Sequence, residues 1–305
     1  MPQLVITSLN TLGYCRRVGR THEARYEQVE QLVLDIDPDV ILLQEMPGDD
    51  RDVAASGLQR LARATKMRCV VSGGRDSSAI TTAAPGGHHR LALGIMWRST
   101  IDPVPDTWHE ISGGPLWHGL IAQTLDAGGR KISVATYHAP PRDGRDHRSA
   151  EAQIISSALI ANSNGHEIIL GGDWNSISAR RLPDGSYYDP DPADTITDDD
   201  RRGWADDPPE ISFPTDREPD RILANAGYLD VAVWCGAPWM PTTGHWDADR
   251  NGPRRLDRIL CRRPGHRPAG RPAVFRVHDT PVARSTSDHL PAVYTHETPN
   301  HAGAW

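Results

Sequence analysis

The chain has 305 residues, a length that fits one large α/β domain or two small ones and is ample for a buried core. Its formal net charge is −7, so the total charge gives no support to binding of nucleic acid through a broad basic face. No stretch approaches about 18 consecutive apolar residues, which argues against a membrane-spanning helix.

The four cysteines, Cys15, Cys69, Cys235 and Cys261, show no CxxC or zinc-ligand spacing. They are therefore expected to be unpaired thiols in a reducing compartment. The N-terminal residues lack the charged segment and long apolar run of a signal peptide. Together these features predict a cytoplasmic protein.

The N-terminal part of the chain predicts a strand followed by a helix. Residues 4–9 form a short apolar run, and Asn10 stands at its end. Apolar residues then repeat with helical spacing over 23–37. Pro38 ends this helix, because proline cannot continue the backbone hydrogen bonding.

A buried strand and a second helix come next. Residues 40–43 are continuously apolar, as in a strand covered on both faces. Gln44 and Glu45 follow it directly. Residues 52–65 again show the spacing of an amphipathic helix.

The middle of the chain is rich in apolar runs that predict strands. These runs lie at 69–71, 91–97, 119–125, 132–137 and 168–170. Two glycines between the third and fourth runs, Gly128 and Gly129, indicate a hairpin. A helix is predicted over 147–161.

Residues 176–220 are rich in Asp, Pro and Arg and poor in aliphatic residues. We expect a long ordered loop there rather than a linker, because strand signals resume after it. The later elements are a helix over 221–228 and strands at 256–260, 274–278 and 292–295. The whole pattern predicts one domain over 1–296 and a tail at 297–305.

Polar residues repeatedly follow the predicted strands. They are Asn10, Glu45, His138, the pair Asp173 and Asn175, and the pair Asp288 and His289. In a sheet-based enzyme, strand ends at one edge converge on one cleft. If Glu45 is buried, its carboxylate requires a partner or a metal ion; an exposed glutamate at a strand end is an equal alternative.

The segment Gly171-Gly172-Asp173-Trp174-Asn175 follows a buried strand. The glycines allow close backbone approach, and the two-residue period of a strand would point Asp173 and Asn175 the same way. An acidic side chain beside a neutral amide suits attack of water on a phosphate. The alternative is a simple Asx-turn.

Asp257 lies in an otherwise apolar and arginine-containing strand, and His289 stands at the start of another. A carboxylate that accepts a hydrogen bond from one ring nitrogen fixes the tautomer and orientation of a histidine. Asp257 is therefore a candidate partner of His289.

Taken in order, these segments resemble the endonuclease/exonuclease/phosphatase superfamily with the deoxyribonuclease-I-like fold. The matching segments are Ser8-Leu9-Asn10, Leu43-Gln44-Glu45, Thr136-Tyr137-His138, Gly172-Asp173-Trp174-Asn175, Arg255-Leu256-Asp257 and Ser287-Asp288-His289. The resemblance implies an α/β (α+β) fold, a four-layer α/β/β/α sandwich of two packed mixed sheets flanked by helices. It also implies a metal-dependent phosphoric ester hydrolase.

The resemblance implies a metal site at Glu45, the principal Mg²⁺ ligand, with Asn10 beside it and Asp288 near the metal or the attacking water. Mn²⁺ is a possible substitute. Mg²⁺ prefers oxygen ligands and keeps several waters, so a sparse set of side chains is adequate.

The remaining roles are implied in the same way. Asp173 would align or deprotonate the water, Asn175 would hold the phosphate, and His138 would contact the scissile phosphate. His289 would stabilise the transition state or act as acid or base, with Asp257 orienting it. The choice of base between Asp173 and His289 stays open.

Three positions depart from the family pattern. Thr136 stands where many members carry Asn, Leu12 where some nucleases place a second Asp, and Trp174 where Phe is commoner. The first two bear on metal and substrate binding and leave the reaction class unchanged.

Two groups of arginines follow Asn10 and His138. The first is Arg16, Arg17 and Arg20, and the second is Arg142, Arg145 and Arg148. Guanidinium groups suit phosphate, so Arg16, Arg17, Arg142 and Arg145 are candidate substrate-binding residues, although a solvated basic loop is an equal alternative.

Three functions are compatible with the site. The first is a nuclease or related phosphodiesterase acting on DNA or RNA, favoured by the breadth of the family. The second is a phosphomonoesterase for a small phosphorylated metabolite or lipid head group, which the acidic total favours. The third, a non-catalytic binding module, is disfavoured because every expected catalytic position is occupied. Trp234, Trp239 and Trp246 could stack a base, although packing explains them as well.

Overall fold

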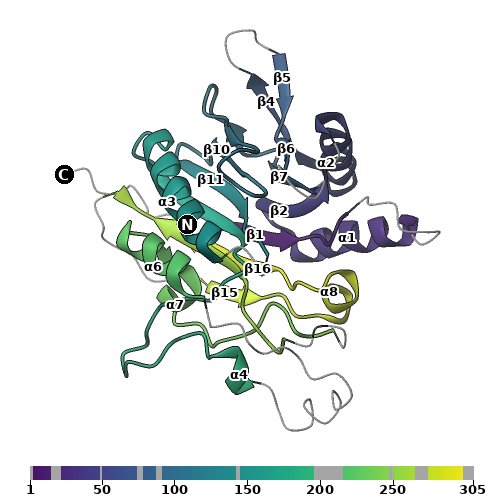
Figure 1. Ribbon diagram of the computed structural model, residues 1–305. Coiled ribbons are helices and arrows are strands. Elements are labelled where there is room, and N and C mark those ends of the chain that lie inside the picture. The colour runs from purple at the N-terminus through teal and green to yellow at the C-terminus, as the bar shows by residue number, and fades with distance from the viewer. Residues whose placement is uncertain are drawn as a thin grey trace.

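The structure is a computed structural model. It describes residues 3–14, 22–48, 50–73, 78–86, 91–141, 145–195, 216–246, 249, 251–264 and 274–297. Within these residues two mixed β-sheets pack face to face, and helices lie on both outer sides (Figure 1).

The first sheet has seven strands in the order β15-β16-β1-β2-β7-β3, with β6 also paired to β7. Their bounds are β1 Gln3–Asn10, β2 Val40–Pro47, β3 Met67–Arg68, β6 Ala83–Pro85, β7 Leu91–Arg98, β15 Val274–Val277 and β16 Ala292–Glu297. β1 and β2 run parallel, and β16 lies antiparallel on the other side of β1. The continuous apolar run of β2 is explained by burial on both faces, because the strand sits in the middle of the sheet.

The second sheet also has seven strands, in the order β13-β14-β12-β11-β10-β8, with β9 paired to β10. Their bounds are β8 Asp102–Pro103, β9 His109–Ile111, β10 Leu120–Asp126, β11 Lys131–His138, β12 Glu167–Asp173, β13 Leu229–Asp230 and β14 Asp257–Arg262. β11 and β12 are parallel, while β14 is antiparallel to β12. A separate hairpin joins β4 (Val70–Gly73) to β5 (Ser78–Thr81).

Helices cover the two outer sides of the sandwich. α1 (His22–Ile36), α2 (Arg51–Thr65) and α8 (Pro281–Thr286) lie on the right of Figure 1, beside the first sheet. α3 (Arg145–Asn162) and α6 (Glu218–Asn225) lie on the left, and α3 packs apolar residues against the second sheet. The predicted four-layer α/β/β/α sandwich is confirmed.

The sequence predicted most long elements and missed short ones. The helix expected over 221–228 runs instead from Glu218 to Asn225, because Pro219 suits a first helical turn and Gly227 adopts a φ of 87° just beyond its end. α7 (Val231–Trp234) and α8 were not predicted. Thr280 caps α8 by accepting a hydrogen bond from the Ala283 N–H, a signal the sequence did contain.

The long segment 176–220 is described only in part. Its described residues contain α4 (Pro192–Thr195), an isolated bridge between Arg181 and Tyr187, and the start of α6. Most of the expected tail lies outside the described residues, and the single domain over 1–296 stays a prediction.

The two sheets approach closely at the end where β12 finishes. A Cβ atom added to Gly171 would lie 2.8 Å from Leu42 Cδ1 and 3.0 Å from Ser8 Cβ, both on the facing sheet. Nearby, Gln44 of β2 donates a hydrogen bond of 2.8 Å to the Thr136 hydroxyl of β11. The glycine and this buried bridge fix the spacing of the layers beneath the polar strand ends.

Candidate active site

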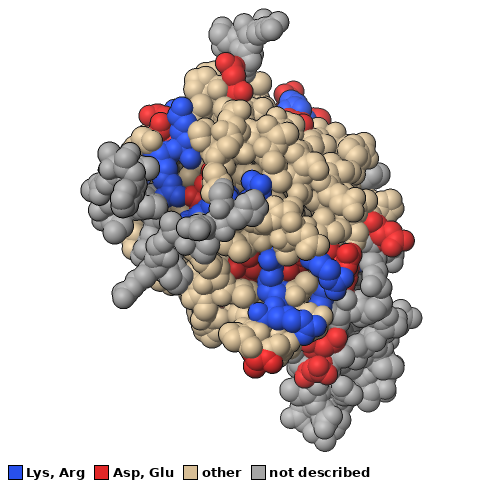
Figure 2. Space-filling view, turned by 90° about the vertical axis from the view of Figure 1, so that its left-hand side faces the viewer, with Lys and Arg blue, Asp and Glu red and all other residues tan. Residues whose placement is uncertain are grey.

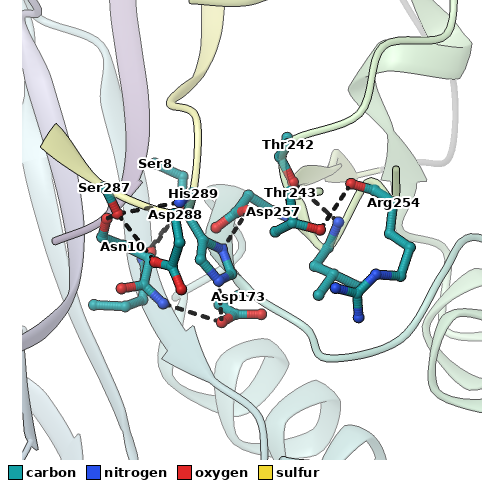
Figure 3. A network of polar contacts seen from close by, with 12 residues as sticks. Ser8, Asn10, Asp173, Thr242, Thr243, Arg254, Asp257, Ser287, Asp288 and His289 are labelled. Atoms are coloured by element: carbon teal, nitrogen blue, oxygen red, sulfur yellow. Dashed lines mark hydrogen bonds and ion pairs between the residues drawn. The ribbon is translucent and has the colours of Figure 1, made fainter. Parts of the chain in front are cut away.

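The polar residues that follow the predicted strands meet at one edge of the sandwich. β1 and β2 end together in parallel, and so do β11 and β12, with His138 opposite Asp173 in the register. β14 begins at this edge because it runs antiparallel, and Asp257 pairs with Asp173. Figure 3 shows residues from these elements pointing toward one another.

Glu45 lies in a β-bulge rather than in regular strand. The register between β2 and β7 shifts between Leu43 and Met46, and Glu45 has a φ of 55°. A bulge of this kind re-aims a side chain and is frequent beside active sites. It leaves the Glu45 carboxylate partly exposed while both neighbours on the strand are buried.

Asn10 links two carboxylates across the sheets. Its Nδ2 lies 3.1 Å from Glu45 Oε1 and 3.1 Å from Asp173 Oδ2. The Asn10 Oδ1 atom accepts a hydrogen bond from the Leu12 N–H, which holds the amide in this orientation. Asn10 therefore couples the end of β1 to the ends of β2 and β12.

The expected alternation of Asp173 and Asn175 is wrong. β12 ends at Asp173, and Asn175 has a φ of 44°, so the two side chains do not follow a strand period. The Asn175 N–H donates to Asp173 Oδ1 at 3.1 Å, which is an Asx-turn. The turn fixes one carboxylate oxygen and leaves Oδ2 facing the site, so the turn and a functional role coexist.

His289 and Asp257, the predicted partners, lie within hydrogen-bond distance of each other. The His289 Nδ1 lies 2.8 Å from Asp257 Oδ2, and its Nε2 lies 3.8 Å from Asp173 Oδ2. Thr242 was not predicted from the sequence. Its hydroxyl accepts hydrogen bonds of 3.0 Å from the N–H groups of Leu256 and Asp257, which fixes the start of β14 (Figure 3).

The buried carboxylates and the histidine perturb one another. Burial alone would raise the pKa of Asp173, but the nearby His289 and His138 outweigh it and hold that pKa below its usual value. Burial would lower the pKa of His289, but Asp257 and Asp173 raise it well above its usual value. Burial raises the pKa of Asp257, although His289 opposes the rise. Asp173 and His289 therefore favour the state in which the Asp173 carboxylate is ionised and the facing ring of His289 is protonated.

Asp288 adds a further carboxylate to the cluster. Burial raises its pKa; His289 opposes the rise, and the negative charges of Glu45 and Asp173 add to it. Such crowding of carboxylates fits a divalent cation that takes oxygen ligands. Arg25 of α1 also faces this cluster and donates to the Thr11 and Leu12 carbonyl groups at 2.7 and 2.9 Å.

Two groups of side chains could hold a metal ion within the described part of the chain. One comprises Glu45, His138 and Asp173, and the other Asp173, Asp257 and His289, with ligand atoms within 4.8 Å of one another in each group. The first group contains the residue expected to be the principal ligand. In the second group, Asp257 and His289 already bind each other.

His138 lies beside Asp173 and has a neighbour that the sequence did not reveal. Its Nε2 is 3.5 Å from Asp173 Oδ2 and 3.9 Å from Glu45 Oε1. The ring stacks on that of His118, with centroids 4.0 Å apart and planes 10° from parallel. The register of β10 and β11, extended by two residues, would have placed His118 opposite Ala139 and so next to His138.

The candidate substrate-binding arginines are only partly described. Arg16, Arg17, Arg20 and Arg142 lie outside the described residues, and so does the side chain of Arg145 at the start of α3. Arg148 is buried and binds Asp216 at 2.7 Å and the Pro140 and Pro141 carbonyl groups. Its assignment to the basic group near phosphate is therefore wrong, because its donors hold the chain together.

Two of the three tryptophans considered for base stacking pack against the core, namely Trp234 and Trp239. Trp246 lies nearer the site, and its Nε1 donates to the Arg284 carbonyl at 2.7 Å. The adjacent His245 approaches the Ser287 carbonyl at 2.9 Å, one residue before Asp288. Among the described cysteines, Cys69, Cys235 and Cys261 are unpaired, and no described helix has the length and apolarity needed to cross a bilayer.

Comparison with known families identifies the class of this protein. Residues 7–289 match the model of the Endonuclease/Exonuclease/phosphatase family, so the chain belongs to that family. It is accordingly an enzyme of the phosphoesterase class, and the family is metal-dependent. A search of curated protein sequences finds no significant match.

Solved structures share the fold at low sequence identity. D. rerio TDP2 complexed with single strand DNA product is 18% identical, with 97% of this chain and 99% of that chain covered and a TM-score of 0.61. The mannosyl-6-phosphatase of Bacteroides thetaiotaomicron is 14% identical, with 95% and 98% covered and a TM-score of 0.56. A family member from Beutenbergia cavernae is 18% identical, with 96% and 71% covered and a TM-score of 0.56.

Proposed function

We propose that this protein is a Mg²⁺-dependent phosphodiesterase that hydrolyses P–O bonds of DNA or RNA by attack of water. The observation that carries the proposal is the continuous line of contacts from Glu45 through Asn10 and Asp173 to His289. It unites a carboxylate for the metal, a carboxylate for the water and a cation for the phosphate in one site.

Glu45 and Asp288 would hold the metal ion, with Asn10 beside them. The donor chemistry supports this assignment, since oxygen atoms dominate and the carboxylates crowd one another. When bound, Mg²⁺ supplies Lewis-acid stabilisation of phosphate charge and of the departing oxygen. Mn²⁺ is expected to substitute.

Asp173 would accept the proton of the attacking water or align it, because its Oδ2 faces the site while its Oδ1 is held by the Asn175 N–H. His289 would stabilise the developing charge through Nε2, since Nδ1 is committed to Asp257. The low pKa of Asp173 and the raised pKa of His289 support this division over the reverse one.

His138 and Asn175 would contact the scissile phosphate. One N–H of the Asn175 amide donates to the Ala139 carbonyl at 3.1 Å, which orients the group without using its second N–H. Arg16, Arg17, Arg142 and Arg145 remain proposed substrate contacts. Trp246, beside the segment that carries His289, would offer a stacking surface for a base.

A second candidate is a phosphomonoesterase for a small metabolite or lipid head group. It is favoured by the net charge of −7 and by the use of Arg148 inside the fold. Figure 2 shows the side of the molecule that carries α3 and α6, where basic residues adjoin acidic ones within the described residues. D. rerio TDP2, which shares this fold, is complexed with a single strand DNA product, and a B. thetaiotaomicron protein with this fold is a mannosyl-6-phosphatase. The fold therefore accommodates both nucleic-acid and small phosphomonoester substrates.

A substrate panel with Mg²⁺ or Mn²⁺ tests the proposal. It comprises plasmid DNA, single-stranded DNA, RNA, bis-p-nitrophenyl phosphate and p-nitrophenyl phosphate. Cleavage of a nucleic acid or of the diester, abolished by a chelator, is expected. Cleavage of the monoester alone would establish the second candidate instead. The cytoplasmic location stays a prediction.

A further inference from the structure

Within the part of the chain that the structure describes, the ring of His138 makes no hydrogen bond that would fix it. Its Nδ1 is buried and has no partner among the described residues, and its Nε2 lies 3.5 and 3.9 Å from the nearest carboxylate oxygens, beyond hydrogen-bond range. His289 differs, because Asp257 holds its Nδ1 at 2.8 Å. A histidine that must meet a phosphate needs its ring plane fixed in some way.

The only described ring that stacks on His138 is that of His118. The two rings lie 4.0 Å apart and within 10° of parallel, and both side chains are almost fully buried. Contact at this distance over a whole ring face prevents rotation of His138 about its Cβ–Cγ bond without a clash. The stack therefore does for His138 what Asp257 does for His289.

One buried carboxylate binds the residues that precede the two stacked rings, one through its backbone and the other through its side chain. Glu151 of α3 accepts a hydrogen bond of 2.7 Å from the Trp117 N–H and one of 2.6 Å from the Tyr137 hydroxyl. Trp117 immediately precedes His118, and Tyr137 immediately precedes His138. A single side chain thus ties together the loop and the strand that carry the two rings.

Two glycines, Gly86 and Gly119, lie next to the backbone of His118. A Cβ atom on Gly86 would lie 2.9 Å from the His118 carbonyl oxygen, so the two backbones are in direct contact. Gly119 has a φ of 108°, a conformation that favours glycine, and leads from His118 into β10. A side chain at Gly86 would press on the backbone of Leu91 and His118, and one at Gly119 would press on the Ile111 carbonyl oxygen.

We propose that His118 is a positioning residue, which fixes the ring plane of His138 through the stack, and that Glu151 sets the stack by clamping Trp117 and Tyr137. The proposal rests on the proposed function, in which His138 contacts the scissile phosphate. His118 itself acts only through His138.

The test compares two substitutions of similar size in the intact protein. His118→Phe keeps a flat ring against His138, whereas His118→Leu keeps apolar volume and loses the ring face. With bis-p-nitrophenyl phosphate and Mg²⁺, His118→Leu is expected to lower kcat about 10–100-fold with little change in KM, as loss of orienting partners typically does. His118→Phe is expected to retain most of the wild-type kcat. The matched control is His109→Leu in the neighbouring strand β9, which should leave kcat unchanged.

A measurement independent of activity follows the stack itself. Ring proton resonances of His138, assigned by their loss in His138→Asn, should be shifted upfield in the wild type and in His118→Phe. They should move downfield in His118→Leu. Glu151→Gln should move them in the same direction, because an amide cannot accept both hydrogen bonds. Tyr137→Phe, which removes one of the two, should have a smaller effect.

Each outcome decides a separate point. Wild-type kcat in His118→Leu, or equal losses in His118→Leu and His118→Phe, would overturn the positioning role. A Glu151→Gln variant with a lower Tm and unmoved His138 resonances would overturn the clamp. A wild-type protein that cleaves no phosphoester would refute the proposed function, while the resonances would still report whether the stack exists.

Discussion

Glu45 illustrates what a single residue contributes and what a sequence reveals about it. Its identity and its place after an apolar run predicted a metal ligand. The bulge and the φ of 55° that aim the side chain could not be predicted, because they depend on the pairing with β7. A non-glycine residue in this conformation costs about 1–3 kcal/mol, which the surrounding strand pairing must offset.

Replacing Glu45 separates function from stability. Glu45→Ala is expected to abolish Mg²⁺-dependent hydrolysis while the fold stays intact. Glu45→Gly should be equally inactive. It should nevertheless unfold at the same temperature as Glu45→Ala or at a higher one, since glycine adopts a positive φ without strain. Hydrolysis assays and thermal unfolding measure the two effects. Full activity of Glu45→Ala would contradict the proposed metal site.

His289 and Asp257 are expected to act as a unit. His289→Ala should abolish hydrolysis with the fold intact. Asp257→Asn should reduce kcat about 10–100-fold, because an amide no longer fixes the tautomer of His289. Asp102→Asn, at an exposed carboxylate in the same sheet, serves as the control. An Asp257→Asn variant with wild-type kcat would show that His289 needs no orienting partner.

At the scale of elements, the sequence predicted strands and helices that carry long apolar runs. It missed short elements, among them β5, β6, β9, α7 and α8, since three to six residues give too short a pattern to recognise. The Asp173–Asn175 alternation failed for a related reason: a strand period was extended past the last strand residue. The six motif segments were nonetheless brought together, because β1, β2, β11 and β12 end at one edge and the antiparallel strands β14 and β16 begin there.

Gly171 controls how closely β12 approaches the first sheet. Gly171→Ala would place a methyl group 2.8 Å from Leu42 Cδ1 and 3.0 Å from Ser8 Cβ. We expect a loss of about 1–3 kcal/mol in the free energy of unfolding, typical of overpacking, together with reduced kcat since Asp173 lies two residues on. Urea unfolding and diester hydrolysis measure these. In Gly185→Ala the added methyl meets no atom within 4 Å but the φ of 88° strains alanine, so this variant should lose stability without losing kcat.

For the whole molecule, the end of the sandwich away from the site is held by a buried ionic cluster around Glu167. Its carboxylate binds Arg263 at 2.7 Å, Cys261 at 3.0 Å and Arg130, and lies 3.4 Å from His296 of the other sheet. Nothing in the sequence indicated this cluster, because its members come from four separate segments.

The cluster predicts loss of stability in acid. Burial alone would raise the pKa of Glu167, but His296, Cys261 and Arg263 outweigh it and lower that pKa. A depressed folded-state pKa stabilises the fold above the unfolded value of about 4.3 and loses that stabilisation as the pH falls below it.

Glu167→Gln tests this by removing the buried negative charge that faces Arg263, Arg130 and His296. We expect a loss of about 1–3 kcal/mol in the free energy of unfolding at neutral pH and a weaker dependence of Tm on pH below about 4 than in the wild type. Thermal unfolding between neutral and acid pH is the measurement. If the dependence of Tm on acid pH is unchanged in this variant, carboxylates other than Glu167 cause the loss of stability in acid.

The pairing of β16 with β1 has a consequence for how the protein is made. β1 is the first described strand to leave the ribosome, yet the strand that covers one of its edges, Ala292–Glu297, is the last. A nascent chain therefore carries an open edge on β1 throughout synthesis, a surface prone to wrong pairing. A chain shortened before Ala292 would keep every proposed catalytic residue and lack the strand that pairs with β1, at whose end Asn10 lies. Hydrolysis is thus expected to begin only after β16 has been synthesised.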